Sequence, residues 1–252
     1  MRAPLSAGEM SYLQEFINRG GNLFVLGGPG RQELMNPIIE QFGVRFMPGQ
    51  LVQPTPLLQA DLIQAIPTDE GAAYWSNLDF IRKNEGCVAM PGCVGLEYTP
   101  TDGITVVPLL STDTTGCWNR IVATDFVRDS VRYMPETGDQ AGIFTTTLAL
   151  TRNVNDLEQR VLIVGNTDFL SNGEFATGRR EVRNFNGILK HAAFYWLSHE
   201  ELPVNTEGDA PIDRKLYVSE AAMEIWSIVF MVVIPVILAL AGIIIWVRRR
   251  GR

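Results

Sequence analysis

Residues 225–247 read IWSIVFMVVIPVILALAGIIIWV, an apolar run in which Ser227 is the one polar side chain. A helix of about 23 residues rises roughly 34 Å, enough to cross a hydrocarbon core of about 30 Å. Trp226 and Trp246 stand near its two ends, where indole rings prefer the membrane interface. A buried core helix, the competing interpretation, needs a shorter run with polar positions on one face. The run therefore predicts a transmembrane helix, kinked at Pro235.

The flanks of this run predict an orientation. Arg248, Arg249, Arg250 and Arg252 follow it directly, whereas the preceding segment mixes acidic and basic residues. Arginine is enriched on cytoplasmic flanks, so residues 248–252 are expected to form a cytoplasmic basic tail. Setting these four arginines aside changes the formal net charge from −7 to −11, so the larger part of the chain is acidic. An acidic surface does not attract nucleic acid, which is therefore not expected as a partner.

The first twenty residues do not have the pattern of an export signal, because no basic segment is followed by an apolar one. Ser6 and Glu9 instead have the spacing of a capping box, and apolar residues repeat at helical spacing from Met10 to Ile17, ahead of Gly20. Two explanations are open. The chain is the C-terminal piece of a longer protein with its own signal or anchor, or it is tail-anchored with its domain in the cytoplasm. We expect the first, because the second inverts the arginine rule.

Short apolar strands alternate with helices ahead of the span. Residues 22–26 (NLFVL) predict a strand, and Asn36 and Pro37 predict a helix with Asn36 as its N-cap. The pattern returns in residues 161–164 (VLIV), followed by a polar turn and a helix at about residues 183–198. Strands that are apolar throughout are buried on both faces, which predicts a parallel sheet in an α/β fold. Further strands are expected at residues 104–110, 121–123 and 143–149.

The chain is expected to divide into four parts. Residues 1–202 form an extracytoplasmic α/β domain, residues 203–224 a linker, residues 225–247 the transmembrane helix and residues 248–252 the basic tail. Within the domain, residues 50–103 are rich in proline, glycine and polar residues. This composition predicts an irregular insertion with one or two short helices.

A glycine-rich turn at residues 27–30 (GGPG) is predicted to be a plain connection between a strand and a helix. Backbone N–H groups ahead of a helix bind phosphate, and a phosphate loop is the alternative. No Gly-Lys-Ser/Thr follows, however, the G-x-G-x-x-G spacing is absent, and the expected helix starts about six residues too late.

The cysteines and histidines predict no metal or cofactor. Cys87, Cys93 and Cys117 lack C-x-x-C spacing, and none lies in a G-x-C-x-G elbow, so neither a zinc site nor a cysteine nucleophile is expected. Outside the cytoplasm, Cys87 and Cys93 could close a small disulfide loop, and free thiols are the alternative. His191 and His199 are eight positions apart on the expected helix, about 12 Å in height, which is too far to share a metal.

The polar turn after residues 161–164 contains the candidate site. Asp168 follows an apolar strand, at the sheet edge where α/β folds tend to bind ligands, and Asn166, Thr167 and Asn172 are close to it in sequence. These four side chains are candidate contacts for a polar ligand or a partner. Asn and Asp also favour turns for purely structural reasons, which is the competing interpretation.

Six segments, taken in order, carry a family resemblance. They are residues 20–26 (GGNLFVL), 36–44 (NPIIEQFGV), 107–113 (VPLLSTD) with Cys117 and Trp118, 161–172 (VLIVGNTDFLSN), 194–197 (FYWL), and the apolar span with its arginines. In this order they resemble the GldG-type family, auxiliary components of bacterial ABC transport systems first associated with gliding motility. The resemblance covers most of the chain except residues 50–103. It implies a partial flavodoxin-like or class I glutamine amidotransferase-like sheet with flanking helices outside the cytoplasmic (inner) membrane, without catalytic residues.

These observations predict a non-enzymatic, single-pass subunit of an ABC-type transport system, whose extracytoplasmic domain binds a partner or a polar ligand without a cofactor. The resemblance implies ABC permease and ATPase subunits as partners beside the lipid bilayer, and the chain itself has no Walker A lysine loop. The alternatives are a membrane-tethered hydrolase using Asp168 with Thr167 or Asn172, and a saccharide-binding receptor with aromatic residues near residues 166–172. The predicted membrane-interface residues are Trp226, Trp246, Arg248, Arg249 and Arg250.

Overall fold

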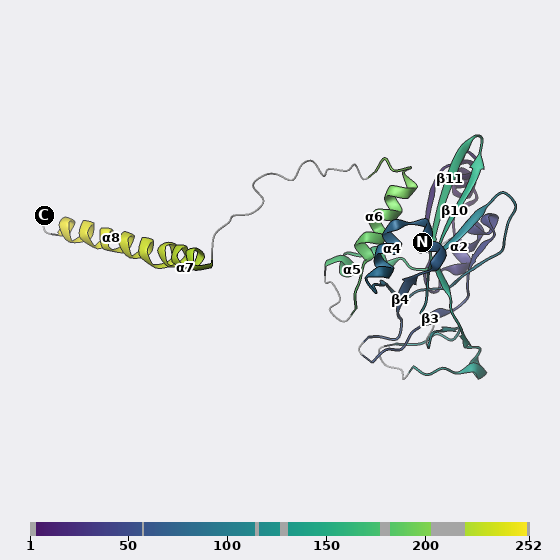
Figure 1. Ribbon diagram of the computed structural model, residues 1–252, viewed down its shortest axis with the longest axis horizontal. Helices are drawn as coiled ribbons and strands as arrows, with labels where there is room; N and C mark the ends of the chain where they lie inside the picture. The colour runs from purple at the N-terminus through teal and green to yellow at the C-terminus, as the bar shows by residue number, and fades with distance from the viewer. Residues whose placement is uncertain are drawn as a thin grey trace. The chain divides into compact units, whose positions relative to one another are not determined.

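The computed structural model describes residues 4–56, 58–113, 116–126, 131–176, 182–202 and 220–250. The chain separates into two compact units, Met1–Val204 and Asn205–Arg252, and each has its own architecture. The first is a mixed α/β unit, in which a curled sheet is flanked by helices (Figure 1). The described part of the second is one long apolar helix.

The main sheet has the strand order β1-β11-β10-β7-β4-β5. Only β1 and β11 run parallel along this path, while each of the other neighbouring pairs is antiparallel. The predicted parallel sheet is therefore confirmed for β1 and β11 and wrong for the rest. Beside this path, β2 pairs with β6, which also pairs with β10. The strands are β1 (Leu23–Leu26), β2 (Val44–Phe46), β4 (Leu62–Pro67), β5 (Val88–Pro91), β6 (Leu96–Tyr98), β7 (Thr105–Ser111), β10 (Thr145–Val154) and β11 (Leu157–Val164).

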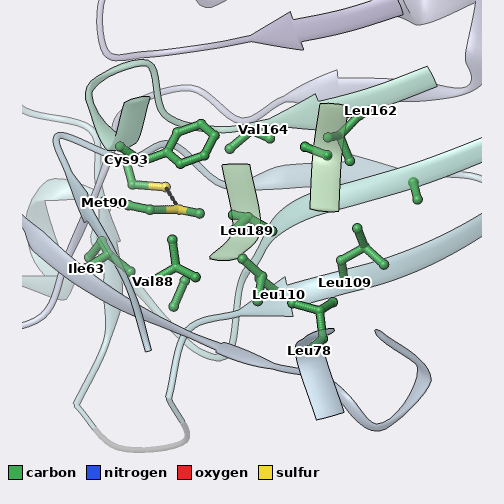
Figure 2. Close-up of a cluster of buried hydrophobic side chains, with 14 of the residues drawn as sticks. Ile63, Leu78, Val88, Met90, Cys93, Leu109, Leu110, Leu162, Val164 and Leu189 are labelled. Atoms are coloured by element: carbon green, nitrogen blue, oxygen red, sulfur yellow. Dashed lines mark hydrogen bonds between the residues drawn. The ribbon is translucent and has the colours of Figure 1, made fainter. Parts of the chain in front are cut away.

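Helices on both faces, rather than parallel pairing, explain why the strands are apolar throughout. Leu162 and Val164 of β11 belong to the same buried cluster as Leu189 of α6, and Figure 2 shows these three side chains together. Ile163 points to the opposite face and joins a second cluster with residues of α1 and α2. The helices of this unit are α1 (Ala7–Asn18), α2 (Gln32–Ile39), α3 (Asp69–Tyr74), α4 (Ser76–Lys83), α5 (Asn172–Ala176) and α6 (Asn186–Leu197).

A tight hairpin turn breaks the predicted parallel order. Asn155 and Asp156 join β10 to β11, and their φ angles are 50° and 63°. Two-residue turns with positive φ match the right-handed twist of paired strands, and Asn and Asp tolerate this region better than most residues. Because only two residues connect the strands, β10 must run antiparallel to β11.

The capping box of the first helix and two of the predicted strands are present in the structure. The capping box of α1 is confirmed, since Ser6 Oγ accepts from the Glu9 N–H at 3.3 Å and the Glu9 carboxylate accepts from the Ser6 N–H at 2.8 Å. The strands expected at residues 104–110 and 143–149 correspond to β7 and β10, although β10 extends further. Residues 121–123 do not form a strand, because β8 (Trp118–Arg120) ends just before them.

The predicted start of the second helix is wrong. Helix α2 begins at Gln32 and contains Pro37 in its interior, four residues earlier than the N-cap expected at Asn36. The Asn36 side chain serves another purpose: its Oδ1 accepts from the Phe46 N–H at 2.8 Å, and its Nδ2 donates to the Phe46 carbonyl at 3.3 Å. This amide fixes β2 against α2, so a long-range contact accounts for an asparagine that resembles a helix cap.

Residues 50–103 contain regular structure in place of the predicted irregular insertion. The two short helices α3 and α4 are present, but β4 and β5 belong to the main sheet and β6 pairs with β10. The segment also begins a separate three-stranded sheet, formed by β3 (Gln50–Val52), β8 and β9 (Gln140–Ala141). Short strands bounded by glycine and proline give a weak sequence pattern, and here their partners are distant in sequence.

Within its described residues, the second unit contains one helix long and apolar enough to cross a membrane, Ile225–Arg250, with a mean hydropathy of 3.2 over its most apolar window. It consists of α7 (Glu220–Ile228), a π-helical turn at Val229–Val233 and α8 (Ile234–Arg250). In the π turn, the Ile234 N–H bonds to the Val229 carbonyl, five residues back. Pro235 follows at once and has no N–H to donate, and the kink expected at this proline stays a prediction.

Candidate functional site

The predicted polar turn lies where β1 and β11 end at the same edge of the main sheet. Gly28, just after β1, is close to Thr167, because a Cβ on Gly28 would lie 3.9 Å from the threonine hydroxyl. Gly92, just after β5, is close to Pro29 in the same way, again at 3.9 Å. Three connections far apart in sequence therefore meet at this edge of the sheet, which is the edge where α/β folds tend to bind ligands.

Asn166 holds these connections together. Its side chain is buried, and the residue is only 1% exposed. The Nδ2 group donates to the carbonyls of Pro91 and Gly92, while Oδ1 accepts from the Phe169 N–H at 2.6 Å. Every polar atom of this amide thus bonds to backbone within the domain, and Asn166 acts as a positioning residue for the turn rather than as an outward-facing contact.

The other three predicted contacts face solvent. Thr167, Asp168 and Asn172 are exposed, with Asp168 beginning a short 3-10 turn and Asn172 beginning α5. The Thr167 hydroxyl lies 3.4 Å from Asp168 Oδ1, a long hydrogen bond between neighbours. The site therefore presents one carboxylate, one hydroxyl and one amide on an open turn, which suits contact with a partner better than enclosure of a small molecule.

Close packing explains the first glycine of the Gly27–Gly30 turn. A Cβ on Gly27 would lie 2.3 Å from the Phe46 ring, so only glycine lets β1 end beside this buried aromatic residue. Helix α2 begins at Gln32, soon after the turn, so the late helix start predicted for this loop is wrong. The interpretation as a plain connection now rests on the missing lysine motif and on the contact between Gly27 and Phe46.

The cysteines are buried thiols that form no disulfide. Cys87 and Cys93 are therefore unlinked, which decides between the two open alternatives in favour of thiols. Burial raises the pKa of Cys87 to about 11, and burial likewise raises the pKa values of Cys93 and Cys117. Cys93 Sγ lies 3.9 Å from Met90 Sδ in the main core (Figure 2). Thiols held protonated in this way are poor nucleophiles and poor metal ligands.

The two histidines lie on α6 and just after its end. His191 is exposed on α6, with its ring centroid 6.3 Å from that of Tyr195, and it lines a shallow hollow of about 430 Å³ together with Phe80. His199 follows the end of α6 with a φ of 53°. Within the described residues, no three His, Cys, Asp or Glu side chains gather as a metal site would require.

A buried ion pair in the three-stranded sheet was not predicted. Asp139 accepts from Arg120 Nε at 3.3 Å and from Nη2 at 2.7 Å, and the two side chains are 0% and 3% exposed. Burial acts to raise the pKa of Asp139, but hydrogen bonds from Arg120 and from the Met134 N–H outweigh it, so this pKa lies below its usual range. Arg120 Nη2 also donates to the Arg132 carbonyl. The partners are 19 positions apart, and no spacing rule links them.

An aromatic hollow of about 330 Å³ lies beside this ion pair. Trp118 and Tyr133 line it, with ring centroids 5.7 Å apart, and the Arg120 guanidinium lies 5.8 Å from the Trp118 ring. The Trp118 indole N–H is buried and has no hydrogen-bond partner among the residues that the structure describes. None of the lining residues comes from the 166–172 turn, where the saccharide alternative expects its aromatic residues.

The predicted membrane-interface residues lie at the two ends of the apolar helix. Arg248, Arg249 and Arg250 occupy its last turn, and the Arg250 guanidinium lies 4.8 Å from the Trp246 ring. Such cation–π stacking holds a cation beside an indole ring, a combination suited to the membrane interface. Trp226 lies near the other end of the span, with its ring centroid 5.8 Å from that of Phe230.

In comparisons with known proteins, no family model matches the chain, and none of the curated proteins matches it either. The resemblance to the GldG-type family therefore remains a prediction from the sequence segments that carry it. The geometry of the turn, the buried groups and the apolar helix is what supports a function.

Proposed function

We propose that this chain is a non-enzymatic, single-pass membrane subunit whose acidic α/β domain binds a partner protein. The observation that carries the proposal is the apolar helix Ile225–Arg250, which is 26 residues long and ends in three consecutive arginines. A helix of this length and composition is suited to a bilayer and would hold the folded unit at its surface.

The orientation follows from the arginines. Arg248, Arg249 and Arg250 at the end of α8 favour a cytoplasmic C-terminus, which would leave the α/β unit outside the cytoplasmic membrane. The acidic character of that unit, with a formal net charge of −7 for the whole chain, disfavours anionic lipid as its ligand and is compatible with a protein partner.

The polar turn supports binding rather than catalysis. Asn166 is fully used in bonds to backbone, Asp168 is exposed beside Thr167, and the cysteine thiols are held protonated by burial. Hydrolysis would need a second acid or base converging on Asp168, and among the described residues only Thr167 bonds to its side chain. The hydrolase alternative gains no support from this geometry.

The family resemblance suggests the class of partner and the finer fold. We propose an ABC permease with its ATPase as the partner, on the strength of the resembling segments alone. We also propose a relationship to flavodoxin-like or class I glutamine amidotransferase-like sheets. The parallel pair β1–β11, covered by α1 and α2 on one face and α6 on the other, supports this relationship, whereas the antiparallel β10, β7 and β4 depart from it.

The test uses the full chain in its native cells. We expect it to stay in the membrane after alkaline carbonate, to be cut by protease added to intact spheroplasts, and to bring an ABC permease and ATPase through purification in mild detergent. Replacing Arg248, Arg249 and Arg250 by glutamine should weaken the orientation and protect a fraction of the domain from protease, whereas replacing Arg45, an exposed residue of β2, should not. Protection of the unaltered domain in spheroplasts would refute the proposed orientation, and extraction by carbonate would refute the anchor.

A further inference from the structure

The two edge strands of the main sheet, β5 and β1, differ in whether their outward backbone groups are hydrogen-bonded. At the β5 edge, the Cys87 N–H donates to the Arg183 carbonyl and the Cys87 carbonyl accepts from the Phe185 N–H, both at 2.9 Å. The Asn186 side chain then accepts from the Ala89 N–H at 2.8 Å and donates to the Ala89 carbonyl at 2.9 Å. The segment ahead of α6 and one buried amide therefore close this edge, as buried sheet edges require.

The β1 edge has no such cover within the described part of the chain. Strand β1 pairs only with β11, and the Gly27 N–H donates to the Val164 carbonyl at 2.8 Å. Since backbone groups alternate in direction along a strand, the N–H and C=O groups of Phe24 and Leu26 point away from β11. No hydrogen bond among the described residues reaches these four groups.

Aromatic side chains frame this open edge from both helix layers. The Phe194 ring of α6 contacts the Phe24 ring edge-on, with centroids 5.8 Å apart, and Phe194 is 49% exposed. The Phe16 ring of α1 packs on Gly21, two residues before β1, and Phe16 is 42% exposed. Two partly exposed phenylalanine rings therefore lie close to β1, where an incoming strand would add apolar contacts to its backbone pairing.

We propose that the β1 edge binds an extended segment of another polypeptide, which adds to the main sheet as a further strand. The N–H and C=O groups of this segment would pair with those of Phe24 and Leu26, as in other cases of strand addition. Its side chains would be apolar on both faces, because helix layers cover both faces of the sheet beside β1. Its ends would be basic, to complement the acidic domain.

A second copy of the chain fits this edge less well. Two copies would bring the same acidic net charge to the edge and would repel each other, whereas a segment with basic ends would not. The inference deepens the proposed partner-binding function and rests on it, because it names the surface and the kind of segment that the partner would contribute.

The test uses a fluorescent, lysine-flanked peptide whose core copies residues 161–164 (VLIV), the strand that pairs with β1 on its other side. With the full chain in mild detergent, we expect saturable binding and at least tenfold slower hydrogen exchange at the Phe24 and Leu26 amides. The Ala89 amide, already bonded at the closed edge, should not change. A peptide of the same sequence, with methyl groups on the backbone nitrogens that would face β1, should bind at least tenfold more weakly, because those N–H donors are lost.

Two sets of variants make the result specific to this edge. Leu26→Pro removes an outward N–H at a position where proline is tolerated in an edge strand, and it should abolish binding without unfolding the domain. Phe194→Lys should also weaken binding severalfold, whereas Phe80→Lys should not, although both phenylalanines are 49% exposed. If Leu26→Pro does not fold, the comparison of peptide binding by Phe194→Lys and Phe80→Lys tests whether the β1 edge is the binding surface.

Two outcomes would overturn the inference. One is unchanged exchange at Phe24 and Leu26 in saturating peptide. The other is slow hydrogen exchange at the Phe24 and Leu26 amides without any peptide, in a chain that has the mass of a dimer. If Leu26→Pro or Phe194→Lys then reduces the mass to that of a monomer, the edge binds a second copy. If the peptide fails while the permease still purifies with the chain, only the docking mode is refuted and the proposed function stands.

Discussion

Removing the charge of Asp139 should destabilise the domain far more than removing the charge of Asp69, although both carboxylates lie 2.7 Å from an arginine nitrogen. The Asp139 carboxylate accepts bonds from Arg120 and from the Met134 N–H and is 0% exposed, whereas the Asp69 side chain is 96% exposed. Breaking a buried pair by removing one partner costs about 3 to 5 kcal/mol, because the other charge is left buried and unneutralised. Exposed pairs contribute about 0 to 1 kcal/mol.

We expect Asp139→Asn to cost about 3 kcal/mol, the lower end of that range, because Arg120 keeps its bond to the Arg132 carbonyl. For a domain of this size, 3 kcal/mol lowers Tm by roughly 6 to 12 °C. Thermal unfolding of the full chain in mild detergent, followed by circular dichroism and by tryptophan fluorescence, measures the shift. Asp69→Asn should leave Tm nearly unchanged, and equal shifts for the two variants would refute the reasoning.

Two further results bear on the same pair. Arg120→Met combined with Asp139→Leu should recover more than half of the lost stability, because no buried charge is then left unpaired. The pKa of Asp139 is lowered in the folded state, so its contribution is present above the unfolded value of about 3.9 and is lost as the pH falls through the folded value. The unaltered chain should therefore lose an acid-sensitive part of its stability below about pH 4 that Asp139→Asn does not show.

The remaining predictions concern the thiols, the glycine turn and the first helix. Cys87 and Cys93 should resist thiol reagents at pH 8 until the domain unfolds, because burial raises the pKa of Cys87 to about 11 and that of Cys93 as well, and rapid labelling of the native chain would contradict this. Gly27→Ala should cost about 1 to 3 kcal/mol by overpacking against Phe46, whereas Gly28→Ala, whose nearest neighbour is 3.9 Å away, should be nearly neutral in denaturant unfolding. Ser6→Ala should cost about 1 kcal/mol in the same assay through loss of the cap of α1, and an unchanged midpoint would show that the cap is not formed.

Sequence reasoning succeeded where the signal was local. The capping box at Ser6 and Glu9 involves residues three apart, and the apolar span needs only composition and length. It failed at Asn36, where a residue typical of helix caps instead bonds to Phe46 across ten positions. It also failed in residues 50–103, whose strands are defined by partners such as β7 and β10 rather than by their own pattern.

The position of the turn with the candidate contacts was predicted for the same reason, and their binding role stays a prediction. The carboxyl end of an apolar strand is visible in sequence, so the turn after β11 was located correctly, next to the end of β1. The separate roles of its residues were not visible. Asn166 bonds to the carbonyls of Pro91 and Gly92, more than 70 positions away, whereas Asp168, two residues on, faces solvent. The ion pair between Arg120 and Asp139 was missed altogether, because only the pairing of β8 with β9 connects them.

Buried amide side chains show where the domain has satisfied its own backbone. Asn36 bonds to the backbone of Phe46, Asn166 bonds to backbone groups at the ends of β5 and β11, and Asn186 bonds to the backbone at the β5 edge. Gln159 likewise donates to the carbonyls of Ile17 and Gly21 where the chain passes from α1 toward β1. These amide side chains bond to backbone N–H and C=O groups that strand pairing leaves free. Among the described residues, none of them lies along the outward edge of β1. Unpaired backbone groups bond either to water or to a partner. Phe194 contacts Phe24 of β1 and Phe16 packs on Gly21 just before it, so an added strand at β1 would bury apolar surface and satisfy backbone groups at the same time.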